Sequence, residues 1–245
     1  MTLPAFRINP RVLAVDSPPI PEAQVWKAAY DGRLGPMIDL SQAVPGTPPP
    51  QAMLDRLAEA AGQGEATRYG HILGDIMLRE AYAAELHRCY GDAVPVESLA
   101  ITAGCNEAFV VTIMALASVG DTVILPTPWY FNHKMTLDML GIAARALPCA
   151  PEAGFVPDVA AAEALIDESV RAIVLVSPNN PTGAIYPKET IHAFAALARR
   201  RGIALVLDET YRDFLPAEHG RPHDLFADRD WGSSLIQLYS FSKAY

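Results

Sequence analysis

The chain has 245 residues, of which 51% are hydrophobic and 8% aromatic, and its formal net charge at pH 7 is −9. This composition supports a substantial core and excludes an intrinsically disordered chain, while the length allows one large domain with at most a small appendage. The acidic balance, without a long basic run, argues against nucleic acid as the main partner.

The cysteines and the apolar runs bear on the compartment. Cys89, Cys105 and Cys149 are far apart and show no metal-binding spacing, which favours a reducing cytoplasm over a disulfide framework. The most apolar run, residues 108–117, is too short to cross a bilayer, and the N-terminus lacks the apolar segment of a signal peptide. We therefore expect a soluble, cytoplasmic protein with no membrane partner.

The first 50 residues are rich in proline, so they predict an extended arm rather than long helices or central strands. Within this arm the sequence indicates a short helix near residues 22–30 and a short strand over 37–40. A helix is predicted over 51–62. After the loop Thr67–Gly70, a second helix is predicted over 75–90, with Gly91 as its stop signal.

From residue 98 onward, apolar strand patterns alternate with helical patterns. Strands are predicted over 99–102, 122–125, 143–147, 172–176, 204–207 and 235–238, and helices over 105–118, 158–168 and 188–201. The strands are continuous apolar runs, which are typical of a parallel sheet covered on both faces. The sequence therefore predicts an α/β fold, a three-layer sandwich with a mostly parallel sheet, in which residues 1–50 form an arm and residues 51–245 the large domain.

Ligands bind beyond the carboxyl ends of the strands in such sheets, so the residues after each strand form the candidate site. Gly104, Cys105 and Asn106 follow the first strand and open a helix, where backbone N–H groups favour an anion such as phosphate. Ordinary strand-to-helix turns also carry one glycine. Trp129–Phe131, after the second strand, can stack on a planar ring or serve as core aromatics. His133 alone indicates a structural histidine.

Two polar motifs follow the next strands. Ser177–Gly183 predicts a tight loop whose asparagine amides can donate to a ligand oxygen, and its Asn180–Pro181 bond is a candidate cis peptide bond. Asp208 ends the next strand, where a buried carboxylate needs a partner such as a protonated pyridine nitrogen. Tyr211, three residues on, can reach the same ligand.

Lys243 follows the last strand. A buried ammonium group is costly unless it is paired or made neutral, for example as an imine with an aldehyde cofactor, whereas a solvated lysine just past a strand end is the simpler alternative. Together the strand ends offer an anion site, an aromatic surface, an amide, a carboxylate, a phenol and a lysine. These are the groups needed to hold a phosphorylated pyridine aldehyde.

Over almost its whole length the chain resembles the fold-type I, class I/II aminotransferases, which depend on pyridoxal phosphate. The motifs Ser177–Gly183, Asp208–Tyr211 and Ser240–Lys243 stand in the family's order and approximate spacing. The resemblance implies pyridoxal phosphate as cofactor, an amino acid and a 2-oxo acid as substrates, transfer of the amino group between them, and a homodimer.

The resemblance also implies roles for single residues. Lys243 would form a Schiff base with the cofactor and then move a proton between the substrate Cα and the cofactor C4′. Asp208 would pair with the pyridine nitrogen, and Asn180 and Tyr211 would hydrogen-bond the phenolic oxygen. Tyr130 would stack on the ring.

Further residues are implied around the phosphate and behind the ring. The residues that match the family's phosphate site are Gly104, Cys105, Asn106 and Ser240. Tyr69 would reach the phosphate of the neighbouring subunit. His133 would stand behind Asp208, as in the aspartate aminotransferase branch.

The chain departs from the family pattern at two places. Ala43, in Ser41–Pro45, stands close to the substrate carboxylate where many members carry glycine. The sequence also ends two residues after Lys243, whereas family members continue with an arginine at the phosphate and with a C-terminal small domain that binds the substrate carboxylate. We therefore expect the N-terminal portion of a longer enzyme, with part of the small domain in residues 1–50, and little transamination by 245 residues alone.

Other functions remain open from the sequence. A carbon–sulfur lyase or a cyclopropane-forming synthase would keep the cofactor and change the groups above its ring. A non-catalytic, regulator-like protein that binds pyridoxal phosphate would need a basic DNA-binding module, for which the proline-rich start leaves no room. A nucleotide-binding α/β protein ranks last because no GxGxxG or GxxxxGK[ST] motif is present.

Overall fold

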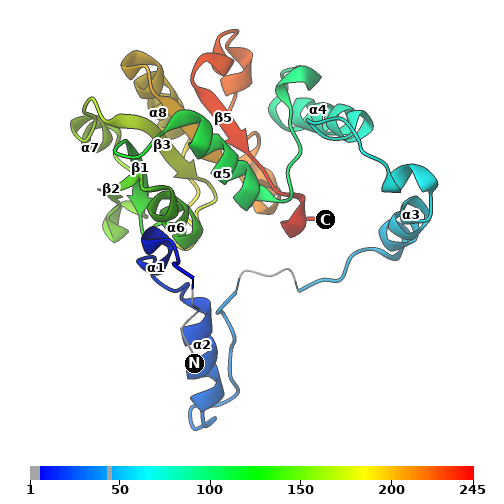
Figure 1. The fold of residues 1–245 in the computed structure, drawn as a ribbon, viewed down its shortest axis with the longest axis horizontal. Coiled ribbons are helices and arrows are strands. Elements are labelled where there is room, and N and C mark those ends of the chain that lie inside the picture. Colours follow the sequence, from blue (N-terminus) through cyan, green and yellow to red (C-terminus); the bar gives the residue numbers. More distant parts are fainter. Residues whose placement is uncertain (1–5, 43–45) are drawn as a thin grey trace.

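The computed structural model describes residues 6–42 and 46–245, and its centre is a five-stranded parallel sheet of order β2-β1-β3-β4-β5 (Figure 1). The strands are β1 (Thr122–Thr127), β2 (Ala143–Pro148), β3 (Val170–Val176), β4 (Ala204–Asp208) and β5 (Leu235–Leu238). Five of the six predicted strands are therefore confirmed. At the end of β4, Asp208 lies between Val176 of β3 and Leu238 of β5, in register with both.

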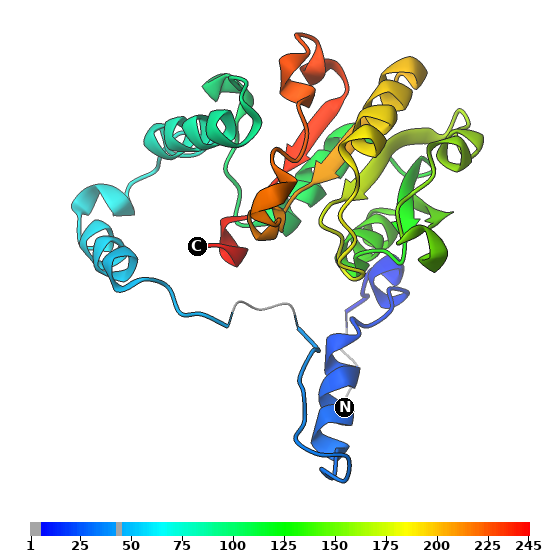
Figure 2. The same cartoon turned by 180° about the vertical axis from the view of Figure 1, so that it is seen from behind.

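Helices cover both faces of this sheet (Figures 1 and 2). One layer contains α7 (Val159–Ala164), α8 (Lys188–Arg201) and the C-terminal part of α4 (Ile76–Tyr90), and the other contains α5 (Cys105–Leu116) and α6 (Phe131–Leu140). Successive side chains of a strand point to opposite faces. In β3, Ile173 and Leu175 accordingly pack in the first layer and Val174 in the second. The predicted three-layer α/β sandwich is confirmed.

The long helices end where their sequence signals predict. Asp75 caps α4 by accepting from the backbone N–H groups of Met77 and Leu78, and Gly91 ends it with a left-handed φ of +85°. Gly202 ends α8 in the same way, after three arginines that favour the negative end of the helix dipole. The predicted helices near 22–30 and over 51–62 correspond to α2 (Ile20–Ala29) and α3 (Gln51–Ala61).

Several predicted elements differ from the structure. Residues 37–40 form no strand, and the helix expected over 158–168 is the shorter α7. Helices α1 (Pro10–Leu13) and α6 were not predicted. Short 3₁₀ turns lie at Gly64–Thr67, Val96–Ser98, Pro151–Ala153, Arg212–Phe214, Ala217–His219, Leu225–Ala227, Trp231–Ser233 and Phe241–Lys243.

The strand predicted over residues 99–102 is wrong. This segment is extended, but a groove of about 550 Å³ lies between it and β5. Neither the segment nor the facing edge of β5 therefore has a strand partner across the groove. Its Ile101 N–H donates to the carbonyl oxygen of Leu73 instead of to a strand. An extended run becomes a strand only when a neighbouring backbone completes the ladder, which an apolar pattern alone does not reveal.

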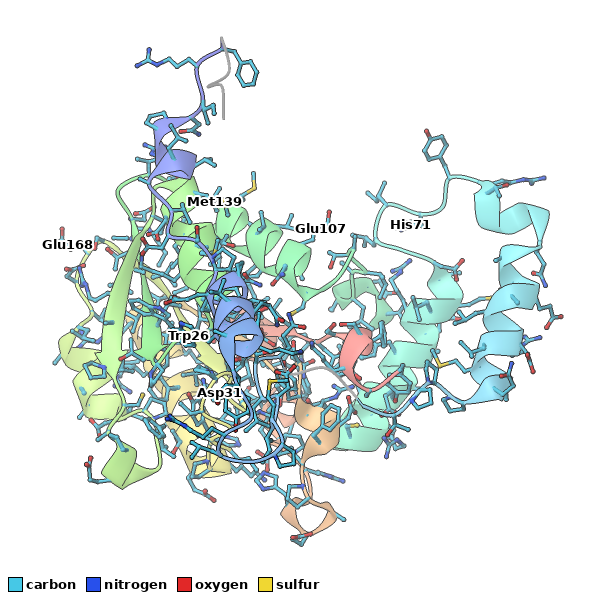
Figure 3. The ribbon with its side chains drawn as sticks, turned by 90° about the horizontal axis from the view of Figure 1, so that it is seen from below. Trp26, Asp31, His71, Glu107, Met139 and Glu168 are labelled. Atoms are coloured by element: carbon cyan, nitrogen blue, oxygen red, sulfur yellow. The ribbon has the colours of Figure 1, made fainter. Side chains whose placement is uncertain are left out.

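The N-terminal helices and α3 lie at the edge of this body. Helix α1 packs against α6, whereas α2 and α3 project away from the sheet in both views (Figures 1 and 2). Neither α2 nor α3 contains a buried residue. Figure 3 shows Trp26 on α2 and His71 in the loop before α4, on separate projections. The division of the chain at residue 50 stays a prediction.

Across residues 6–42 and 46–245, none of the helices combines the length and the apolar character needed to cross a membrane.

Candidate active site

A cavity of about 230 Å³ lies at the carboxyl ends of the strands. The chain adds β2 on one side of β1 and then β3, β4 and β5 on the other, so the connections after β1 and β3 diverge at this end and leave a crevice. The residues that line it are Ala103, Gly104, Cys105, Asn106, Tyr130, Val176, Asn180, Asp208, Thr210, Tyr211, Ser242 and Lys243. Eight of the predicted cofactor-binding residues therefore meet on one cavity. The larger groove beside β5 contains neither Asp208 nor Lys243.

The N-terminus of α5 forms one wall of the cavity. Gly104 precedes the helix with φ +88° and ψ 166°, a conformation that is essentially restricted to glycine. Because the helix begins at Cys105, the N–H groups of its first turn have no acceptor within the helix. These N–H groups and the positive end of the helix dipole favour an anionic ligand.

Asp208 provides the buried negative charge of the site. Its side chain is only 4% exposed, and its Oδ2 lies 3.3 Å from Nε2 of His133. Burial alone would raise the pKa of this carboxyl group, but the hydrogen bonds and charge of His133, together with the hydrogen bonds from Thr210, outweigh it and lower the pKa. Asp208 is therefore a carboxylate at neutral pH, ready to pair with a cationic group.

His133 and Tyr130 are held by aromatic contacts at the start of α6. The imidazole of His133 stacks on Phe109 of α5, with ring centroids 3.9 Å apart, and meets the edge of Tyr130 at 5.0 Å. The side chain of Asn132 donates to the Tyr130 hydroxyl at 2.7 Å. Burial raises the pKa of Tyr130, which keeps the phenol protonated. The Tyr130 ring is thus fixed against the cavity.

The loop Ser177–Gly183 brings Asn180 to the cavity. Asn179 is buried, and its Oδ1 accepts from the backbone N–H and the hydroxyl of Thr182 at 3.1 and 2.8 Å, so it braces the loop. The predicted cis peptide bond at Asn180–Pro181 is confirmed, and Ser177–Pro178 is also cis. Asn180 and Tyr211 both line the cavity, so an amide and a phenol meet on the same site.

Lys243 is placed by the short 3₁₀ turn that follows β5. Ser240 caps this turn, and its Oγ accepts from the backbone N–H of Ser242 at 3.3 Å. The ammonium nitrogen of Lys243 lies 5.8 Å from the centroid of the Tyr211 ring. The lysine amine, the phenol of Tyr211 and the carboxylate of Asp208 therefore share one cavity.

Three predicted residues, Ser240, His133 and Tyr69, lie elsewhere, and a fourth, Ala43, is not described. Ser240 is buried and lines the larger groove, while Ser242 takes a place on the cavity wall. His133 stands behind Asp208, outside the lining. Tyr69 is fully exposed in the loop before α4, and Ala43 lies outside the described residues.

Thr210 and Ser242 were not predicted as site residues, although both line the cavity. They lie within the motifs Asp208–Tyr211 and Ser240–Lys243, one residue before Tyr211 and Lys243. Hydroxyl side chains next to predicted functional residues were the available signal. Which of them faces the cavity depends on the local turn, and the spacing alone does not reveal this.

Comparison with known proteins finds aminotransferases among the relatives of this chain. The chain is 31% identical to the valine–pyruvate aminotransferase of Mycobacterium tuberculosis over 232 residues, which cover 93% of the chain and 58% of that protein. It is 34% identical to the aspartate/prephenate aminotransferase of Thermus thermophilus over 76% of the chain and 48% of that protein. The structure of the Thermus thermophilus aspartate aminotransferase with maleate matches with a TM-score of 0.85 and 28% identity, over 98% of this chain and 62% of the other.

The chain thus spans about half to three fifths of the length of these relatives. The sequence pattern of the family "Aminotransferase class I and II" matches residues 35–245, which include the whole sheet and every residue of the cavity. The chain belongs to the class I and II aminotransferase family.

Proposed function

We propose that the chain binds pyridoxal phosphate in the 230 Å³ cavity and serves the transfer of an amino group between an amino acid and a 2-oxo acid. One observation carries the proposal. A buried carboxylate backed by His133 and a lysine amine occupy the same cavity, next to the open N-terminus of α5.

The residues present fit this cofactor. The Asp208 carboxylate, with its lowered pKa, suits a protonated pyridine nitrogen. The Tyr130 ring suits the face of the pyridine, and the side chains of Asn180 and Tyr211 suit its phenolic oxygen. The first turn of α5, from Gly104 to Asn106, suits the phosphate. When bound, pyridoxal phosphate supplies an aldehyde for the lysine and a ring that withdraws electrons from the substrate Cα.

The side chains of the chain then have separate tasks. Asp208 keeps the ring nitrogen charged, because an ion pair at contact distance contributes about 4 kcal/mol at an effective dielectric constant of about 20. Lys243 holds the cofactor and carries the proton to and from the substrate Cα. Tyr211 and Asn180, which line the same cavity as Lys243, would orient the ring.

We further propose that two copies of the chain associate. Tyr69 is fully exposed and is not among the residues that line the cavity of its own chain. It belongs to the segment between α3 and α4, which lies apart from the sheet in Figure 1 and contains the labelled His71 in Figure 3. Its neighbours Ile72 and Met77 are also exposed, at 93% and 76%. Isolated large apolar groups are common at surfaces, but several exposed ones within a short stretch of chain favour a partner surface. In a homodimer Tyr69 would reach the phosphate of the other cavity.

Titration of the chain with pyridoxal phosphate tests the proposal. We expect a visible absorption band that saturates at one cofactor per chain, and loss of that band in Lys243→Ala. Lys188→Ala is the matched control, because Lys188 pairs with Asp224 on the surface. A folded wild-type chain that gives no band, or a Lys243→Ala variant that keeps it, would contradict the proposal.

The reaction class is tested on loaded protein with single amino acids. An aminotransferase keeps the amino group and converts the bound cofactor to pyridoxamine phosphate as it releases a 2-oxo acid, whereas a lyase releases the amino group as ammonia and leaves the cofactor an aldehyde. Chromatography of the released cofactor and acid separates these outcomes. If no amino acid yields pyridoxamine phosphate, the assignment as an aminotransferase would be refuted, while the assignment of the cofactor site would stand.

A further inference from the structure

The two oxygens of the Asp208 carboxylate are held in different ways. Oδ1 accepts two short hydrogen bonds from Thr210, from its backbone N–H at 3.0 Å and from its hydroxyl at 2.7 Å. Oδ2 has two longer contacts, with Nε2 of His133 at 3.3 Å and with the thiol of Cys105 at 3.9 Å. A carboxylate has about four acceptor positions. All four are therefore engaged, and the weakest contact is the one from the thiol.

The Cys105 thiol has a second acceptor within reach. Its Sγ lies 3.5 Å from Oγ1 of Thr210. The Thr210 hydroxyl has one proton, and it donates this proton to the nearer oxygen, Oδ1 of Asp208, so toward the thiol the hydroxyl can act only as an acceptor. The S–H group can therefore donate either to Asp208 or to Thr210 with little movement of the side chain.

The thiol stays a donor at neutral pH. Burial and the neighbouring charge of Asp208 raise the pKa of Cys105 to about 12. Cys105 lines the same cavity as Asp208, so both side chains are available to a ligand bound there.

We propose that Thr210 and Cys105 are positioning residues for Asp208: Thr210 fixes Oδ1, and the Cys105 thiol occupies the acceptor position on Oδ2 that the N–H of a pyridine ring takes on binding. The displaced S–H group then donates to the Thr210 hydroxyl. This inference rests on the proposed cofactor. Beyond that function, it predicts that the Asp208 carboxylate is already oriented, with all its acceptor positions occupied, before the cofactor binds.

The S–H stretching band of Cys105 in the infrared spectrum tests the exchange directly. The difference between wild type and Cys105→Ala isolates this band, and the bands of Cys89 and Cys149 cancel. Pyridoxal phosphate should shift the Cys105 band in wild type from one hydrogen-bonded position to another. In Thr210→Val, which lacks the second acceptor, the cofactor should move the band to the frequency of a free thiol. An unchanged wild-type band, or the same shift in Thr210→Val, would overturn the proposal.

Cofactor affinity provides the second readout. Thr210→Val should weaken pyridoxal phosphate binding about tenfold, because a charged carboxylate loses one hydrogen bond, and Thr210→Ser should restore it to within about twofold. Equal losses in both variants would assign Thr210 a packing role and contradict the positioning role.

The thiol contact is also testable without cofactor, which separates this inference from the proposed function. In folded, cofactor-free Asp208→Asn, the neutral amide is a weaker acceptor, so the Cys105 band should leave its wild-type position and move toward the position of a thiol that donates to Thr210. A wild-type chain that binds no pyridoxal phosphate would refute the proposed function. A Cys105 band that ignores Asp208→Asn would refute the thiol contact itself.

Discussion

Replacement of Tyr90 by phenylalanine should destabilise the chain far more than the loss of one hydroxyl on the surface. Tyr90 ends α4 and is completely buried. Its hydroxyl donates to Oε2 of Glu209 at 2.6 Å, and it accepts from Nε2 of Gln237 at 2.7 Å and from Nη1 of Arg212 at 3.3 Å. The substitution leaves a buried carboxylate without one of its donors.

The magnitude follows from the charge of Glu209. A hydrogen bond to a charged group contributes about 1.5–3 kcal/mol, and its loss in a buried site also leaves polar groups unsatisfied. In the variant, Glu209 keeps its hydrogen-bond contacts with the side chain of Gln237 and, at 3.4 Å, with that of His223. We therefore expect Tyr90→Phe to lower the free energy of unfolding by about 2–3 kcal/mol.

Urea unfolding followed by circular dichroism measures this difference. The control is Tyr30→Phe, because Tyr30 is exposed and its hydroxyl donates to a neutral group, the carbonyl oxygen of Gly35. That control should change the free energy of unfolding by less than about 0.5 kcal/mol. A loss in Tyr90→Phe no larger than in the control would refute the role of this buried cluster in stability.

Three further predictions concern the site and the buried acids. Gly104→Ala should lower the free energy of unfolding by about 1–3 kcal/mol because of its φ of +88°, whereas Gly232→Ala, at an unstrained position, should cost less than about 1 kcal/mol; thermal unfolding compares them. His133→Phe should weaken pyridoxal phosphate binding about tenfold without unfolding the chain, because Asp208 loses a donor; equal affinity would contradict this. Asp208 and Glu209 have lowered pKa values in the fold, so the unfolded chain binds more protons in acid. Urea midpoints should therefore fall as the pH drops below the ordinary carboxyl values of 3.8 and 4.5, and a midpoint independent of pH would contradict it.

The sheet was predictable because its strands are continuous apolar runs between clear turn signals. β1, β2, β3, β4 and β5 all lie where the sequence predicted them. The segment 99–102 has the same apolar character and is not a strand, since strand formation also needs a partner backbone. Helix α6 was missed because its apolar residues lack a regular period, although Gly141, with a left-handed φ at its C-terminus, was an available signal.

The candidate site was predictable where residues follow a strand directly. Asp208, Asn180 and Lys243 reach the cavity because parallel strands bring their carboxyl ends together. No role was predicted for the neighbouring Glu209, although it is as buried as Asp208. Its side chain points to the opposite face of the sheet, where it binds Tyr90. Its partner Tyr90 is 119 residues away in the sequence, so no local sequence pattern predicts the pair.

The central claim is that Lys243 is the residue that bonds to the cofactor, and chemical trapping tests it most directly. The chain has four lysines, and the other three pair with aspartates at or near the surface: Lys27 with Asp39, Lys134 with Asp138 and Lys188 with Asp224. Borohydride reduction after incubation with pyridoxal phosphate fixes the bond, and peptide mass spectrometry locates it. We predict one cofactor per chain, on the peptide that contains Lys243. A cofactor spread over the other lysines, or absent from Lys243, would contradict the account.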